Sequence, residues 1–183
     1  MQGGMNTWKG ITARGFPEVS MAFFPLDQSF EEAIAVAWHL EEGMRRFYAE
    51  VSLMLGDHKP GDIFRDLTAA EENHKALLAS LYHELLEKEF QPADFVSSTR
   101  LVGEPDSIIE GGIRLSEALV WLPGKPAKDV LEFSLALETN AYDRYLILAD
   151  KAEEERSRRV FRALSRKEKK HLERLTEVFK QTT

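Results

Sequence analysis

The sequence predicts an all-α protein that folds as a four-helix bundle, and three features of the chain support this fold class. Four long segments carry apolar residues at steps of three and four, the spacing of one helix face. Short polar breaks separate the first segment from the second and the third from the fourth, which predicts two antiparallel hairpins. A long connection lies between the second and third segments. We therefore expect it to cross the length of the bundle and give an up-down-down-up order.

The first two helices are predicted at residues 29–55 and 62–89. Ser29 followed by Glu32 matches a capping box, in which each side chain accepts a hydrogen bond from the other residue's backbone N–H. The segment 56–61 contains two glycines and a proline, which interrupt the helical period. We expect the first reversal of the chain at this segment.

The same signals predict the crossover and the last two helices. Residues 90–127 form the crossover, with a short helix at about residues 115–122. The third and fourth helices are predicted at residues 128–151 and 158–180, joined by a polar turn at residues 153–157. Both are long enough to pack against the first two along the bundle.

Residues 1–28 differ in composition from the rest of the chain. They are rich in turn-forming residues, glycine among them, and show no helical period. We therefore divide the chain into an N-terminal tail, residues 1–28, and a bundle domain, residues 29–183.

Composition excludes several classes of function. The net charge of −7, without a basic stripe that contains aromatic residues, argues against nucleic acid as a partner. The absence of cysteine excludes disulfides, thiolate metal sites and a cysteine nucleophile, and it fits a reducing compartment. No apolar run approaches the roughly 18 residues of a membrane span. We expect a cytoplasmic protein with neither membrane nor nucleic acid as a partner.

Two Glu-x-x-His pairs occupy matched positions in the two halves of the chain. Each pair is preceded, 30 residues upstream, by a further glutamate, and the two halves repeat at an offset of 97 residues. One such pair is a weak signal in an acidic helical chain, whereas two pairs with the same upstream partner are a specific one. The residues of this pattern are Glu41, Glu71, His74, Glu138, Glu168 and His171.

These residues are predicted to face the interior of the bundle. Leu67 precedes Glu71 by four residues, Leu78 follows His74 by four, and the fourth helix repeats this arrangement. Burying four carboxylates without partners costs several kcal/mol each, and we expect no Lys or Arg on the apolar face to pair with them. Two divalent cations would balance the four negative charges. The sequence therefore predicts a dinuclear metal site, and its mixed carboxylate and imidazole ligands suit two ions of iron or manganese, with zinc as a further alternative.

A tyrosine follows each upstream glutamate by seven residues, Tyr48 after Glu41 and Tyr145 after Glu138. Each tyrosine lies on the same helix face as its glutamate. Two interpretations remain open. Each tyrosine is a core residue whose hydroxyl is bonded within the protein, or it donates a hydrogen bond to a metal ligand and orients that carboxylate.

Residues 29–180 resemble the ferritin-like superfamily and, within it, the rubrerythrin-like branch. The family pattern of a glutamate, a tyrosine seven residues later and then a helix with Glu-x-x-His occurs here twice. The resemblance implies that the six residues of the pattern are metal ligands and that Glu71 and Glu168 bridge the ions. Glu110, in the step Ile-Ile-Glu-Gly-Gly, is a candidate additional carboxylate. Catalysis through the metal site would involve the four glutamates Glu41, Glu71, Glu138 and Glu168.

Residues 1–18 resemble the closing segment of a rhodanese sulfurtransferase domain, whose cysteine loop has no counterpart in this chain. The simplest interpretation is the remnant of a longer rhodanese–ferritin-like fusion. The alternative is a glycine-rich tail without fixed structure. Neither interpretation gives these residues a catalytic role.

The resemblance implies a diiron protein that reduces hydrogen peroxide, or dioxygen as the close variant, with each ferrous ion supplying one electron. Rubrerythrins also carry a small iron–tetracysteine domain. Because this chain has no cysteine, we expect an external electron donor. We also expect a homodimer and a role in oxidative stress. Two alternatives remain: iron sequestration without turnover, and a helical interaction module that uses the metal only for folding.

Overall fold

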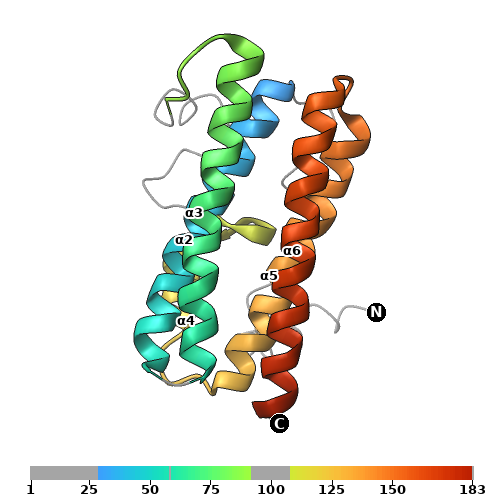
Figure 1. Ribbon diagram of the computed structural model, residues 1–183. Helices are drawn as coiled ribbons and strands as arrows, with labels where there is room; N and C mark the ends of the chain where they lie inside the picture. Colours follow the sequence, from blue (N-terminus) through green and yellow to red (C-terminus); the bar gives the residue numbers. More distant parts are fainter. Residues whose placement is uncertain (1–28, 58, 92–107, 183) are drawn as a thin grey trace, which may run out of the picture.

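The computed structural model describes residues 29–57, 59–91 and 108–182. Its four long helices are α2 (Phe30–Leu55), α3 (Lys59–Leu86), α5 (Ala127–Lys151) and α6 (Glu155–Thr182) (Figure 1). The predicted all-α four-helix bundle is confirmed. None of the helices in the described ranges combines the length and hydrophobicity that a bilayer span requires. The N-terminal tail and its resemblance to a rhodanese segment lie outside the described residues.

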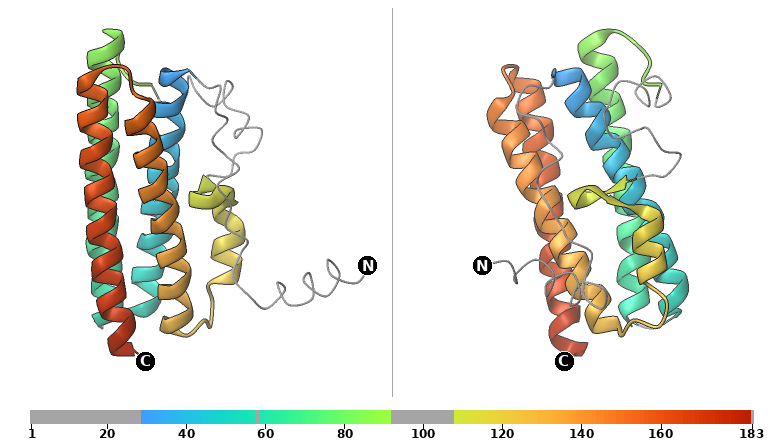
Figure 2. Two further views of the ribbon diagram at one scale, coloured as in Figure 1. Left: turned by 90° about the vertical axis from the view of Figure 1, so that its right-hand side faces the viewer. Right: turned by 180° about the vertical axis from the view of Figure 1, so that it is seen from behind.

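The four helices follow the predicted up-down-down-up order. α2 packs antiparallel to α3, and α5 packs antiparallel to α6 (Figure 1). α3 and α5 run in the same direction, because α3 ends at the upper end of the bundle and α5 begins at the lower end (Figure 1). Figure 2 shows the described part of the crossover between them, which lies against one side of the bundle. This arrangement places the two halves of the repeat side by side.

The crossover contains a small β-hairpin that the sequence analysis did not predict. The hairpin consists of strand β1 (Ile108–Ile109), the 3-10 turn η2 (Glu110–Gly112) and strand β2 (Ile113–Arg114). Helix α4 (Leu115–Trp121), which was predicted at about residues 115–122, follows it. The two strands pair antiparallel, with Ile109 opposite Ile113. Both glycines of the turn have positive φ, 76° and 73°, a conformation that glycine adopts without steric cost. The Glu-Gly-Gly step therefore reverses the chain and holds Glu110 at the tip of the hairpin.

The predicted capping box fixes the N-terminus of α2. The Oγ atom of Ser29 accepts a hydrogen bond from the backbone N–H of Glu32 at 3.2 Å. In return, Oε2 of Glu32 accepts one from the backbone N–H of Ser29 at 2.9 Å. The reciprocal bonds satisfy two backbone donors that the start of a helix would otherwise leave unpaired.

Two helices begin earlier than the sequence analysis predicted. α3 begins at Lys59 rather than at residue 62, and Pro60 lies in its first turn. A proline is tolerated there because the first turn has no intrahelical partner for its N–H. α6 begins at Glu155 rather than at residue 158, so the polar turn before it is shorter than predicted.

Two apolar clusters fill the bundle, one toward each end. Along α3, Leu67 belongs to the cluster at the lower end and Leu78 to the cluster at the upper end. Along α6, Leu175 and Leu164 belong to the same two clusters in the same order. The residues between these leucines therefore lie midway along the bundle, in a layer enclosed by apolar side chains.

Gly43 of α2 allows the hairpin of the crossover to approach the bundle closely. A Cβ atom at this position would lie 1.9 Å from the carbonyl oxygen of Ile108, so a larger residue would displace β1. Ile108 also packs against Val36 and Leu40 of α2. The hairpin is therefore held directly against the helix that carries Glu41.

Gly43→Ala is expected to lower the free energy of unfolding by about 1–3 kcal/mol, because β1 must move away from α2 to accommodate the methyl group. Thermal unfolding followed by circular dichroism measures the change. Glu50→Ala, an exposed substitution in the same helix, is the control and should leave the melting temperature nearly unchanged. A Gly43→Ala protein as stable as the wild type would contradict the close approach.

Candidate metal centre

The polar layer of the bundle contains all six residues that the sequence analysis singled out as metal ligands. α2 and α5 each contribute the upstream glutamate, and α3 and α6 each contribute a Glu-x-x-His pair. None of the six is more than 6% exposed. The residues are Glu41, Glu71, His74, Glu138, Glu168 and His171.

The six residues form two overlapping groups of four. In each group the candidate ligand atoms all lie within 4.8 Å of one another. Each group offers three carboxylates and one imidazole, and Glu71 and Glu168 belong to both. The first group is completed by Glu41 and His74, the second by Glu138 and His171. The shared glutamates therefore lie where two ions would need bridging ligands.

The ligand atoms converge as they do around a cation. His74 Nδ1 lies 2.9 Å from Glu71 Oε2 and 3.0 Å from Glu168 Oε1. His171 Nδ1 lies 3.0 Å from Glu168 Oε2. Glu71 Oε2 and Glu168 Oε1 are buried, yet neither has a hydrogen-bond partner of acceptable geometry among the described residues. Buried carboxylate oxygens are unfavourable without partners, so these residues fit a pair of divalent cations.

The two tyrosines bond to glutamates of the opposite half of the repeat. Tyr48 of α2 donates its hydroxyl hydrogen to Oε1 of Glu138 on α5, at 2.6 Å. Tyr145 of α5 donates to Oε1 of Glu41 on α2. Both interpretations of the tyrosines therefore hold. Their hydroxyls are hydrogen-bonded within the core, and the acceptors of these bonds are candidate metal ligands. Each bond leaves the other carboxylate oxygen facing the centre.

Arg144 of α5 overturns the expectation that no basic residue pairs with the buried carboxylates. It is 1% exposed and donates from Nη2 to Oε1 of Glu41 at 2.9 Å. The signal was present in the sequence, because Arg144 follows Leu137 by seven residues and so lies on the same inward face of α5. At the equivalent position in the first half of the repeat, the chain has Phe47.

Glu110, the candidate additional carboxylate, is buried at the tip of the hairpin. It accepts a hydrogen bond from Arg144 and is not a member of either ligand group. Burial raises the pKa of its carboxyl group to about 8, against the opposing charge of Arg144. Its contacts make it a hydrogen-bond partner of Arg144.

Burial and the neighbouring charges shift the pKa values of the candidate ligands. Burial raises the pKa of Glu138 to about 7. At Glu41 the effect of burial is outweighed by the hydrogen bond and charge of His74 and by the charge of Arg144, so the pKa lies well below its usual range. Burial would lower the pKa of His171, but the neighbouring carboxylates outweigh it and raise the pKa to about 11. The metal-free cluster is thus stabilised by the protons that it retains.

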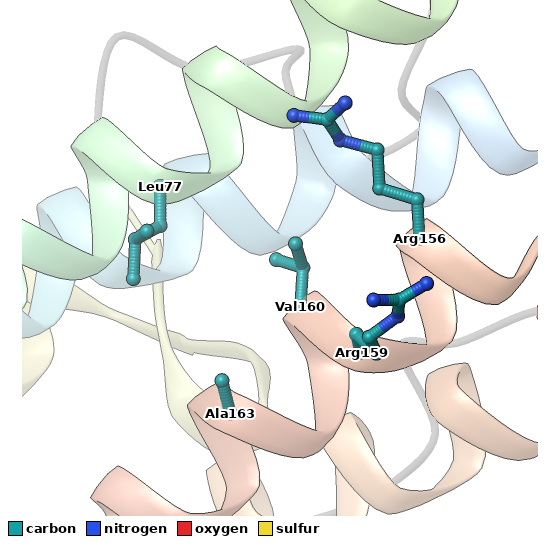
Figure 3. Close-up of a pocket in the computed structure, with 5 residues that line it drawn as sticks. All are labelled: Leu77, Arg156, Arg159, Val160 and Ala163. Atoms are coloured by element: carbon teal, nitrogen blue, oxygen red, sulfur yellow. The ribbon is translucent and has the colours of Figure 1, made fainter.

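A surface groove between α3 and α6 lies apart from the centre. Leu77 of α3 and Val160 and Ala163 of α6 supply its apolar lining, and Arg156 and Arg159 supply its basic end (Figure 3). None of these residues belongs to the ligand groups. We therefore assign the groove no part in the chemistry of the centre.

Tyr48→Phe is expected to weaken metal binding by about tenfold to a hundredfold, because Glu138 loses the hydrogen bond that orients it. Competition with a chelating dye for a divalent ion measures the affinity. Tyr142→Phe, which alters a partly exposed tyrosine on α5, is the matched control. Equal affinities in the two variants would show that the hydroxyl of Tyr48 does not position a ligand.

The metal-free protein is expected to lose stability as the pH rises from about 6 to about 9. A group whose pKa is higher in the folded protein binds more protons when folded, so its contribution is lost as the pH rises through the folded pKa. The pKa values of Glu138, Glu110 and His171, raised to about 7, 8 and 11, all act in this direction. Melting temperatures of chelator-treated protein across this range test the expectation. A melting temperature that increases with pH would refute it.

Comparison with known proteins is consistent with this centre. Residues 129–183, which carry Glu138, Glu168 and His171, match the rubrerythrin family model. No curated protein matches the chain. A solved structure of a hypothetical protein from Pyrococcus furiosus is similar, with a TM-score of 0.65 and 20% identity over 90% of this chain and 96% of that one. At this identity the likeness shows the fold alone. Residues 129–183 are therefore similar to the rubrerythrin family, and the solved structure shares the fold of the bundle.

Proposed function

We propose that the chain holds two iron ions in this centre and reduces hydrogen peroxide there, with dioxygen as the close variant. The observation that supports this most is the sharing of Glu71 and Glu168 by two ligand groups, each with its own imidazole. A site for one ion would need only one of these groups. The match of residues 129–183 to the rubrerythrin model supports a protein of the diiron type.

The composition of the ligand set favours iron. Four carboxylates balance two divalent ions, and mixed oxygen and nitrogen ligands suit iron and manganese, whereas zinc has no redox chemistry. Two bound ferrous ions would supply the two electrons that cleavage of the O–O bond requires. Manganese remains the closest alternative, because it accepts the same ligands.

The protein's own residues would bury the site and hold its ligands in place. The apolar clusters on either side exclude bulk water from the layer between them. The hydroxyls of Tyr48 and Tyr145 remain protonated donors, because burial raises their pKa values well above the usual range. They hold Glu138 and Glu41 with one oxygen toward the centre.

Turnover would require a reductant from outside the chain, because the sequence contains no cysteine to carry an iron–sulfur site. We therefore propose an external electron donor and a role in defence against oxidative stress in the cytoplasm. A homodimer is part of the same proposal. Neither nucleic acid nor a membrane is proposed as a partner.

Iron sequestration is the second candidate function. The burial of the ligands, none more than 6% exposed, would slow both the release of iron and the access of an oxidant. The same ligand set would then hold iron without turnover. The rate of oxidation by peroxide distinguishes the two functions.

Metal-free chain reloaded anaerobically with ferrous iron is expected to bind about two irons. One equivalent of peroxide should then produce ferric near-ultraviolet absorption rapidly. Glu71→Ala should lose both the second iron and the fast absorption change, because both ligand groups contain Glu71. Glu71→Gln tests the same loss with the shape of the side chain retained, and Glu173→Ala on the exposed face of α6 is the control.

Each outcome of this experiment selects one function. Fewer than two bound irons would refute the dinuclear site. Two irons with slow oxidation would favour sequestration. A melting temperature unchanged by metal removal would exclude a purely structural role for the metal.

A further inference from the structure

The upstream glutamates of the two halves of the metal centre have matching contacts with a histidine and a tyrosine. Oε2 of Glu41 lies 3.3 Å from Nδ1 of His74, and Oε2 of Glu138 lies 3.3 Å from Nδ1 of His171. Oε1 of each glutamate accepts a hydrogen bond from a tyrosine of the opposite half. The halves differ in the contact of each histidine with the shared glutamate of the opposite half, 3.0 Å for His74 with Glu168 and 3.8 Å for His171 with Glu71. They also differ in charge, because Arg144 stands where the first half of the repeat has Phe47.

We propose that Arg144 makes the two ion positions unequal, so that the position with Glu138 and His171 binds its ion first and more tightly. The position with Glu41 and His74 would bind second and more weakly. This inference rests on the dinuclear site proposed above and concerns the order in which its positions fill.

Arg144 weakens Glu41 as a metal ligand. Oε1 of Glu41 accepts hydrogen bonds from both Arg144 and Tyr145, whereas Oε1 of Glu138 accepts one only from Tyr48 among the described residues. A carboxylate already paired with a guanidinium attracts a second cation less strongly. The guanidinium cannot lose its proton to relieve the conflict. An ion at Glu41 therefore meets a fixed positive charge that an ion at Glu138 does not.

The crossover holds this charge in place. Arg144 donates to the buried carboxylate of Glu110 as well as to Glu41, and its guanidinium lies 4.1 Å from the ring centroid of Tyr145. The hydrogen bond to Glu110 gives the buried guanidinium a second acceptor besides Glu41, which makes its burial tolerable. The guanidinium of Arg144 still lies against Oε1 of Glu41. Arg144 is thus a positioning residue that acts on the metal through Glu41.

Cobalt(II) titration of the metal-free full chain measures the two binding steps by calorimetry and visible absorption. We expect two steps whose dissociation constants differ by about tenfold or more, a difference within the range that groups bonded to ligands produce. Equal constants for the two steps would overturn the proposal. The dinuclear site itself would survive that result as long as two ions bind.

Variants of the two histidines identify which position fills first. Each removes one imidazole from an otherwise intact chain. His171→Ala should abolish the tight step, and His74→Ala should abolish the weak one. The reverse assignment would overturn the proposal without affecting the count of ions. Loss of all binding in both variants would instead refute the dinuclear site on which the proposal rests.

Variants of Arg144 test the cause of the inequality. Arg144→Gln combined with Glu110→Gln removes the guanidinium and the carboxyl group together, so that neither is left buried without the other. The dissociation constants of the two binding steps should then differ by no more than about threefold. Arg144→Lys keeps the charge and should keep the steps apart. Phe47→Leu, at the equivalent position of the other half, is the apolar control. An unchanged separation of the steps in the folded double variant would show that Arg144 does not set it.

Discussion

The structure depends on the burial of four carboxylates and two imidazoles in the middle of an apolar bundle. Each carboxylate would cost several kcal/mol in that layer without a partner. The polar contacts in the layer give the buried carboxylates partners. The imidazoles face the carboxylates, two tyrosine hydroxyls donate to the upstream glutamates, and Arg144 pairs with Glu41. Two oxygens, Oε2 of Glu71 and Oε1 of Glu168, lie close to Nδ1 of His74 but make no hydrogen bond of acceptable geometry with the described residues. These two buried carboxylate oxygens are the strongest physical reason to place cations between the glutamates.

This requirement also ties the two halves of the repeat together. A single hairpin contains one upstream glutamate and one Glu-x-x-His pair, and each ligand group takes a glutamate from the other hairpin. Tyr48 and Tyr145 likewise find their acceptors only across the bundle. One hairpin alone would leave a buried hydroxyl and a buried carboxylate without partners. The duplication therefore produced a single centre with shared ligands, and neither half can form it alone.

Helical spacing was sufficient to predict the bundle and the six candidate ligands, because a period of 3.6 residues converts distance along the chain into position on a face. It could not predict the partners of Tyr48 and Tyr145, which depend on which helices are neighbours. The strands β1 and β2 are too short to show the alternation that identifies a strand. The burial of Arg144 was not predicted, although its spacing from Leu137 places it on the inward face of α5. Charged residues are almost never fully buried unless they are paired. Its partner Glu110 lies in the crossover, where no helical period indicates which side chains face inward.

The crossover is part of the centre, because it supplies what the repeated halves lack. Gly43 lets the hairpin lie against α2, and the two glycines of the turn aim Glu110 inward. Glu110 then makes it possible to bury Arg144, and Arg144 alters Glu41 but not Glu138. Two identical hairpins would give two equivalent ion positions. The proposed difference between the positions therefore involves Arg144 of α5 together with Glu110 of the crossover.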